Sequence, residues 1–236
     1  MKISKLIYGL PIFGAFLSLT MHWPIFSLDL QSNHVWRQTQ TQTVINNFYE
    51  EDFCILNPRI NSRGDTDGIQ RMEFPLMQWT YAAAYKLFGP SIKLSRILSF
   101  CIGLLSAIGV YFLSAGFFKN KQIGLISFYC LLFAPSFYYY TVCPMPDNLA
   151  LCFGIWGLYF STRWIRTTSP LALILTVILL ALSALVKLPF LLFYAVPGIH
   201  ALVQFRKRLD WNSTKPIWVM STSAIPVAAW YIWVIP

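Results

Sequence analysis

Charged residues are scarce in this sequence: Lys, Arg, Asp and Glu make up 11% of its 236 residues, whereas hydrophobic residues make up 56%. Soluble domains carry about 25% charged residues, so this composition excludes an ordinary soluble fold. The mean hydropathy of +0.55 points the same way. Because a bilayer-crossing helix needs about 20 mostly apolar residues, a chain of this length has room for about seven such helices and one large loop. We therefore expect an all-α integral membrane protein.

Residues that commonly ligate metals are few and scattered. The three histidines, His22, His34 and His200, share no ligand spacing, and the five cysteines form no CxxC pair. The cysteines are therefore interpreted as small buried apolar residues. The sequence predicts no cofactor, although loop carboxylates leave a divalent metal cation open as an alternative.

Acidic residues are rarer than basic ones: the sequence has 9 Asp and Glu and 18 Lys and Arg, which gives a net charge of +9. The sequence has no basic stripe interleaved with aromatic residues, so we expect no nucleic-acid partner and assign the positive charge to cytoplasmic loops. One domain of residues 1–236 is expected, with seven transmembrane segments: 6–28, 97–118, 122–142, 149–165, 170–186, 188–205 and 216–235.

The positive-inside rule gives the expected orientation. With seven spans, basic residues of the short loops, such as Lys119 and Arg163, fall on the same side as Lys2, and we assign that side to the cytoplasm. The N-terminus is then cytoplasmic, and a large first loop of about residues 29–96 is external. Residues 6–28 are interpreted as an uncleaved span rather than a signal peptide, because no small-residue cleavage site follows them.

The segment 74–89 is apolar, but it is short for a span and contains Gln78 and Lys86. If it crossed the membrane, the later loops would change sides and the charge asymmetry would be lost. We therefore expect an amphipathic helix lying at the outer membrane boundary. A helix packed inside the loop is a compatible alternative.

Acidic residues that could act as catalysts lie on the expected external side. Asp147 precedes an apolar helix, where a carboxylate serves either as a helix cap or as a functional acid at the membrane boundary. Asp29 and Glu73 belong to the large first loop. Carboxylates in such places can act as a general base or hold a divalent cation against a phosphate.

Basic and amide side chains on the same side are candidates for substrate binding. Lys187 and Arg96 lie at span ends, where a cation either extends its charged end to the surface or meets a lipid phosphate. Amide side chains can hydrogen-bond to sugar hydroxyls, and a guanidinium group can bind phosphate. The alternative is that these side chains belong to a solvated loop without a binding role. Just beyond the first span these candidates are His34, Arg37, Gln38 and Gln40.

Several short strings resemble, in order and spacing, the GT-C superfamily of glycosyltransferases. The chain is most similar to the bacterial branch that groups with dolichyl-phosphate-mannose protein mannosyltransferases and the lipid A aminoarabinose transferase. The resemblance runs from the first span to near the end of the chain. The strings are WRQTQT at 36–41, EFPL at 73–76, KLFG at 86–89, SRILS at 95–99, PDNLA at 146–150 and LVKLP at 185–189.

The resemblance implies transfer of a sugar from a polyprenyl-phosphate-linked donor to a lipid, glycan or protein acceptor. The reaction is expected on the outer, periplasmic face of a bacterial plasma membrane, with a loop carboxylate as base. By position, Asp147 matches the acid of the second external loop, and Glu73 lies in a region that reads Glu/Lys-Pro-Pro in relatives. Arg37 matches the arginine of the first-loop helix, and Lys187 matches a basic residue near the donor phosphate.

The chain departs from these relatives in two respects. Many relatives have an Asp-Glu pair where this chain reads Asn33-His34, and Asp29 lies one turn earlier as a candidate substitute. The chain is also shorter than its relatives, which makes a truncated, non-catalytic subunit one alternative. A transporter or flippase for lipid-linked sugars is another. It predicts ionisable groups in the middle of the spans, whereas here the charges lie at the span ends.

Overall fold

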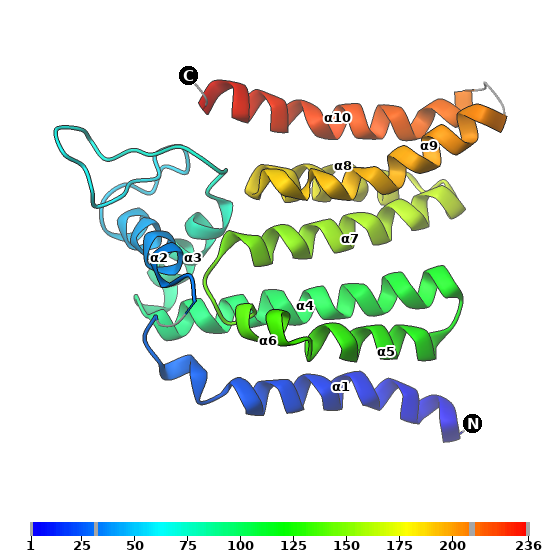
Figure 1. The fold of residues 1–236 in the computed structure, drawn as a ribbon, viewed down its shortest axis with the longest axis horizontal. Coiled ribbons are helices and arrows are strands. Elements are labelled where there is room, and N and C mark those ends of the chain that lie inside the picture. Colours follow the sequence, from blue (N-terminus) through cyan, green and yellow to red (C-terminus); the bar gives the residue numbers. More distant parts are fainter. Residues whose placement is uncertain (1, 31–32, 208–210, 235–236) are drawn as a thin grey trace.

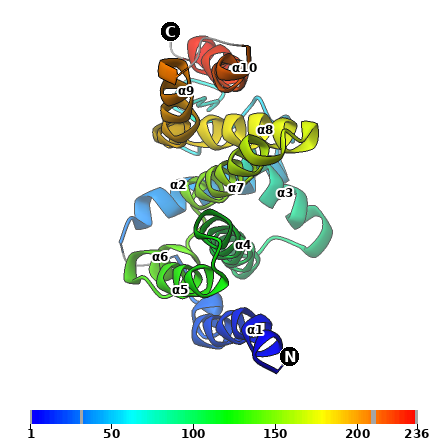
Figure 2. The same ribbon diagram turned by 90° about the vertical axis from the view of Figure 1, so that its right-hand side faces the viewer.

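The computed structural model describes residues 2–30, 33–207 and 211–234, and it is built from α-helices. Figure 1 shows long helices lying side by side, with the chain passing back and forth between two ends. The N-terminus lies at one end, and a layer of loops and two helices, here called the loop layer, covers the other. In the view along the helices, α1 and α10 lie at opposite edges of the stack (Figure 2).

Proline opens three of the helices, as expected for a residue whose fixed φ suits the first helical position. The long helices are α1 (Lys2–His22), α4 (Ile92–Phe118), α5 (Lys121–Leu132), α7 (Pro146–Thr167), α8 (Pro170–Val186), α9 (Ala195–Lys207) and α10 (Trp211–Val234). The remaining elements are η1 (Ile25–Ser27), α2 (Val35–Glu50), α3 (Leu76–Phe88), α6 (Pro135–Tyr140) and η2 (Leu188–Tyr194).

The helices follow most of the expected spans, with four main differences. In the segment 6–28, α1 ends at His22 and the 3-10 helix η1 follows. The segment 122–142 is divided into α5 and α6, because Pro135 lacks the N–H that would continue the first helix. The segment 188–205 begins as the 3-10 helix η2 before α9, and Pro189 lies in its first turn. Helix α4 begins at Ile92, so the external loop ends before residue 96. Residue 235 of the expected last span lies outside the described residues.

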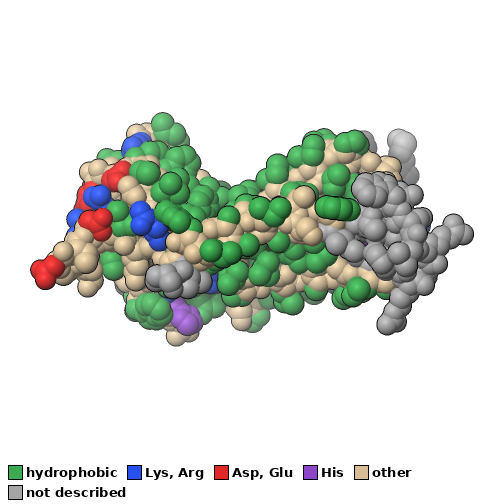
Figure 3. Space-filling view, turned by 90° about the horizontal axis from the view of Figure 1, so that it is seen from above, with side chains coloured by type: hydrophobic (Ala, Val, Ile, Leu, Met, Phe, Trp, Pro, Cys, Tyr) green, Lys and Arg blue, Asp and Glu red, His purple; other side chains and the backbone are tan. Residues whose placement is uncertain are grey.

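In the described part of the chain, one helix, Ile92–Phe118, is by itself long and apolar enough to cross a bilayer. Shorter apolar helices cover residues 9–22, 121–132, 170–186, 188–200 and 218–234. Figure 3 shows that hydrophobic side chains cover the long helices on one face, whereas charged side chains gather over the loop layer. The helical architecture agrees with a membrane protein, and the seven-span topology stays a prediction.

The loop layer is held by apolar packing between α2, α3 and the ends of the long helices. One core joins Phe48 of α2 and Tyr85 of α3 to Leu149 of α7. The Tyr85 hydroxyl is also a polar junction, because it lies 2.8 Å from Gln42 Nε2 and 2.7 Å from Ser95 Oγ. The segment 74–89 therefore forms a helix packed within the loop layer.

The far end of α3 has a different environment from its packed face. Leu87 and Phe88 are 78% and 76% exposed, and Lys86 precedes them. Exposed apolar side chains next to a cation suit the boundary between membrane and water. The two interpretations of this helix, packed and lying at the boundary, are thus compatible in one structure.

Candidate active site

The structure brings together four of the residues singled out by the sequence, from four separate parts of the chain. Glu73 accepts a bond of 2.8 Å from Arg37 Nη2 through Oε2 and one of 2.5 Å from Lys187 Nζ through Oε1. The same Lys187 Nζ lies 3.7 Å from Asp147 Oδ2. We call these four residues the acid–cation cluster. It lies where α2 and the start of α3 meet the ends of α7 and α8.

The backbone on both sides of Glu73 is held by hydrogen bonds to the long helices. Trp230 Nε1 on α10 donates to the carbonyl of Met72 over 3.1 Å. On the other side, the N–H of Phe74 donates to the carbonyl of Leu185 over 3.0 Å. Glu73 is therefore fixed between α8 and α10, although it belongs to the loop that precedes α3.

Asp147 and Lys187 take their positions from helix ends. Asp147 lies in the first turn of α7, where a carboxylate interacts favourably with the helix dipole. Met145 occupies the N-cap position, so the helix-cap interpretation of Asp147 is wrong. The neighbouring Asn148 fixes this turn, because its Nδ2 donates to the carbonyls of Tyr140 (2.7 Å) and Cys143 (3.0 Å). Lys187 is the C-cap of α8 and has an extended backbone.

The cluster is partly buried, and its two carboxylates differ in environment. The side chains of Arg37, Glu73 and Lys187 are 18–19% exposed, whereas that of Asp147 is 39% exposed. Both oxygens of Glu73 are paired with cations. Asp147 Oδ2 is buried and has no hydrogen-bond partner among the described residues. Of the two carboxylates, Asp147 therefore has the fewer partners within the described residues.

Two cavities lie against the cluster. A narrow cavity of about 40 Å³ is lined by Arg37 and Glu73 together with the amides of Gln40, Gln70 and Gln78. A larger cavity of about 500 Å³ has Asp147 on its wall. Most of its other lining is apolar or aromatic and includes Tyr140, Met145, Leu151 and Phe190. The cluster thus has an amide-lined cavity on one side and an apolar cavity on the other.

The remaining candidates from the first loop surround the cluster to different degrees. Gln40 accepts a bond of 3.1 Å from Arg37 Nη1, and exposed His34 lines the larger cavity. Gln38 is buried and donates to the carbonyl of Asn33. Asp29 is exposed, and its carboxylate accepts from the N–H that follows it. The structure therefore brings Gln40 and His34 to the site and leaves Asp29 outside the cluster.

Arg96, another candidate for substrate binding, is bonded to the protein backbone. It is 4% exposed, and its guanidinium donates to three backbone carbonyls: those of Leu28 (3.1 Å), Asp29 (2.8 Å) and Val142 (3.2 Å). These bonds join α4 to the start of the loop layer and to the turn before α7. A buried arginine with this set of acceptors stabilises the local fold.

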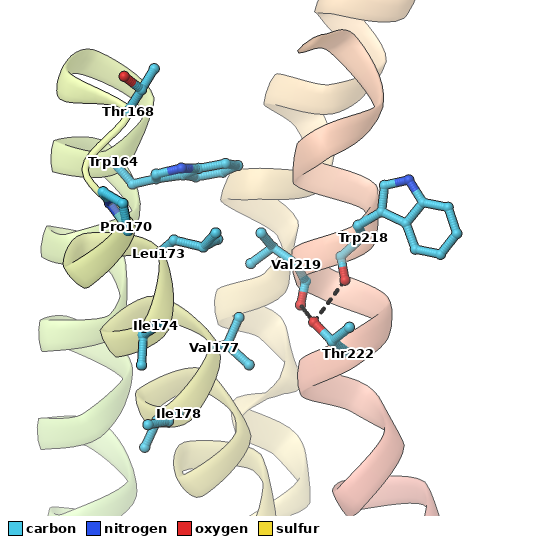
Figure 4. A pocket seen from close by; sticks show the side chains of 10 residues that line it. All are labelled: Trp164, Thr168, Pro170, Leu173, Ile174, Val177, Ile178, Trp218, Val219 and Thr222. Atoms are coloured by element: carbon cyan, nitrogen blue, oxygen red, sulfur yellow. Dashed lines mark hydrogen bonds between the residues drawn. The ribbon is translucent and has the colours of Figure 1, made fainter. Parts of the chain in front are cut away.

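A further cavity, of about 570 Å³, lies between α7, α8 and α10 (Figure 4). Trp164, Leu173 and Val219 line it, and the side chains drawn there include no acid, base or thiol. Thr222 Oγ1 is bonded to the carbonyls of its own helix. The described lining of this cavity therefore suits apolar material.

Metal and thiol chemistry find little support in the described part of the chain. It contains no group of three His, Cys, Asp or Glu side chains that could hold a metal ion. Cys143 lies close to the cluster in sequence, but burial raises the pKa of its thiol to about 11. Because the thiolate is the reactive form, Cys143 is a poor nucleophile at neutral pH.

Comparison with known proteins adds a family to this geometry. Residues 73–233, more than half of the chain, match the family model described as dolichyl-phosphate-mannose-protein mannosyltransferase. The match begins at Glu73 and includes Asp147 and Lys187, whereas Arg37 precedes it. No curated protein and no solved structure matches the chain. The chain therefore belongs to the dolichyl-phosphate-mannose-protein mannosyltransferase family and is a membrane glycosyltransferase of the GT-C type.

Proposed function

We propose that this protein transfers a sugar from a polyprenyl-phosphate-linked donor to an acceptor hydroxyl on the outer face of the membrane. The observation that carries the proposal is the position of the acid–cation cluster, next to an apolar cavity at the ends of the helices. A lipid-linked sugar has an apolar chain, a phosphate and a polar sugar in series. The apolar cavity and the two cations supply partners for the apolar chain and the phosphate.

In the proposed reaction, the acceptor oxygen attacks the anomeric carbon of the sugar. Asp147 accepts the hydroxyl proton, and the bond between the anomeric carbon and the phosphate oxygen breaks. The electron pair of that bond leaves with the polyprenyl phosphate. Lys187 and Arg37 stabilise the negative charge that accumulates on the leaving phosphate.

Asp147 is better placed than Glu73 to act as the base in this arrangement. Both oxygens of the Glu73 carboxylate are already paired with cations. Asp147 has a longer contact of 3.7 Å to Lys187 and borders the larger cavity. The location of these charges at the helix ends favours chemistry at the membrane boundary over a transport path through the helices.

The proposal is tested by incubating membranes that contain the protein with radiolabelled polyprenyl-phosphate sugars. Asp147→Asn is expected to lower label transfer by about 10²- to 10⁴-fold, since it removes a general base. Asp65→Asn, the same change at an exposed loop residue, serves as the matched control and should leave transfer intact. Full transfer by the Asp147 variant would remove Asp147 from the mechanism. A wild-type protein inactive with every donor would support a non-catalytic subunit.

A further inference from the structure

The Glu73 carboxylate spans two cations that belong to different parts of the fold. Arg37 comes from α2 and Lys187 from the end of α8, and each binds a different oxygen of the same carboxylate. A phosphate group offers the same feature, namely two or more oxygens that can bind two neighbouring cations. We infer that Glu73 occupies the position of the donor phosphate in the ligand-free protein, and that phosphate binding displaces it. The inference rests on the proposed function and adds to it an exchange of anions.

The charges of the cluster favour such an exchange. Arg37 and Lys187 carry two positive charges, and Glu73 and Asp147 carry two negative ones, so the cluster is neutral. A sugar-linked phosphate adds one negative charge. Keeping all three anions on two cations in a partly buried site would leave one charge without a partner, which is costly. If Glu73 leaves, two cations again face two anions.

The narrow cavity beside the cluster provides a place for the displaced carboxylate. It is lined by Glu73 itself, by Arg37 and by the amides of Gln40, Gln70 and Gln78, and apolar residues such as Val44 and Ile60 complete its wall. Gln78 is 9% exposed, and its Oε1 has no hydrogen-bond partner within the described ranges. A half-turn of this amide exchanges Oε1 for Nε2, which can then donate to a carboxylate. The volume of about 40 Å³ is also sufficient for one or two water molecules around the displaced group.

The exchange needs only a side-chain rotation. The Met72 carbonyl is bonded to Trp230, and the Phe74 N–H is bonded to Leu185, so the backbone around Glu73 is held on both sides. The carboxylate can therefore change partners while its Cα stays in place. Lys187 keeps its second contact, to Asp147, and so remains next to the proposed base when the phosphate arrives.

The inference is tested by measuring the affinity of the purified full-length protein for farnesyl phosphate in detergent. Glu73→Gln keeps the shape of the side chain but removes its charge, so the cations become available. We expect this variant to bind farnesyl phosphate about tenfold more tightly, because the ligand no longer displaces two partly exposed ion pairs. Lys187→Gln is expected to bind it more weakly than the wild type. Glu50→Gln, an exposed change of the same type on α2, should leave the affinity unchanged.

Farnesol, which lacks the phosphate, distinguishes the cation pair from the apolar cavity. Its affinity should be equal for the wild type and Glu73→Gln, and an equal gain for both ligands would contradict the exchange. Inorganic phosphate should compete with farnesyl phosphate more effectively in Glu73→Gln than in the wild type. If inorganic phosphate competes in neither protein, the cation pair binds phosphate only when it is attached to a lipid. The comparison of farnesyl phosphate with farnesol then tests the exchange.

The two proposals fail in different ways. Unchanged or weaker binding by Glu73→Gln, together with normal sugar transfer by the wild type, would overturn the exchange and leave the proposed function standing. If neither protein distinguishes farnesyl phosphate from farnesol, recognition of the phosphate fails, and both proposals fall. Should Glu73→Gln not fold, judged by thermal unfolding, Glu73→Asp replaces it. Its shorter carboxylate reaches the two cations less well, so a smaller gain in affinity is expected.

Discussion

Replacing Arg96 with lysine separates a structural role of this residue from the substrate contact expected from the sequence. Lysine keeps the positive charge, but its single ammonium group cannot reach three carbonyls that a guanidinium bonds at once. If one bond survives, two charge-assisted bonds in a 4% exposed site are lost. At about 1.5–3 kcal/mol for each bond, the free energy of unfolding should fall by about 3–6 kcal/mol.

Thermal unfolding in detergent and protease sensitivity of the loop layer measure the effect of Arg96→Lys. Arg166→Lys is the matched control, because exposed Arg166 donates to one carbonyl, that of Gly116, at the opposite end of the helices. It should cost less than about 1 kcal/mol. If Arg96→Lys unfolds like the wild type but needs more donor for half-maximal transfer, Arg96 binds substrate and the structural role is refuted.

Three further predictions concern packing, pH and topology. Gly103→Ala should destabilise the protein by about 1–3 kcal/mol in thermal unfolding, because the new Cβ would clash with Thr141 Oγ1. Gly9→Ala, with open space around it, should be neutral. The hydrogen bond from Arg63 lowers the pKa of Glu51 below its usual 4.5. The ion pair therefore stabilises the loop above pH 4.5, and this stabilisation is lost as the pH falls through the lowered pKa. Limited proteolysis of residues 51–71 should therefore accelerate in acid. In Glu51→Gln, cleavage should already be faster at neutral pH, and acid should not accelerate it further. Reporter fusions at residues 60 and 120 should lie on opposite sides of the membrane, and finding both on one side would contradict the topology.

Apolar runs and prolines predicted most helix positions. The segment 170–186 coincides with α8, since both ends carry a strong signal: Pro170 at the start and Lys187 at the end of an apolar run. The sequence did not predict the break between α5 and α6. The surrounding residues are uniformly apolar, so hydropathy does not register the missing N–H of Pro135.

The sequence predicted which residues lie on the same side of the membrane, but it did not predict which of them contact one another. The predicted topology placed Arg37, Glu73, Asp147 and Lys187 on one side, and the structure brings them within ion-pair distance. Their catalytic and binding roles stay proposals. The bond from Trp230 to Met72 has no local signal, because nothing near either residue indicates which partner it meets.

That bond between Trp230 and Met72 has a consequence for the order of events during synthesis. The two residues are 158 positions apart. At about 5–20 residues per second, roughly 8–30 seconds pass between the addition of the first and of the second. Throughout this interval, the carbonyl preceding Glu73 lacks the indole that later fixes it. A nascent chain can insert and pack its early helices, but the backbone beside Glu73 is fixed only when α10 joins them.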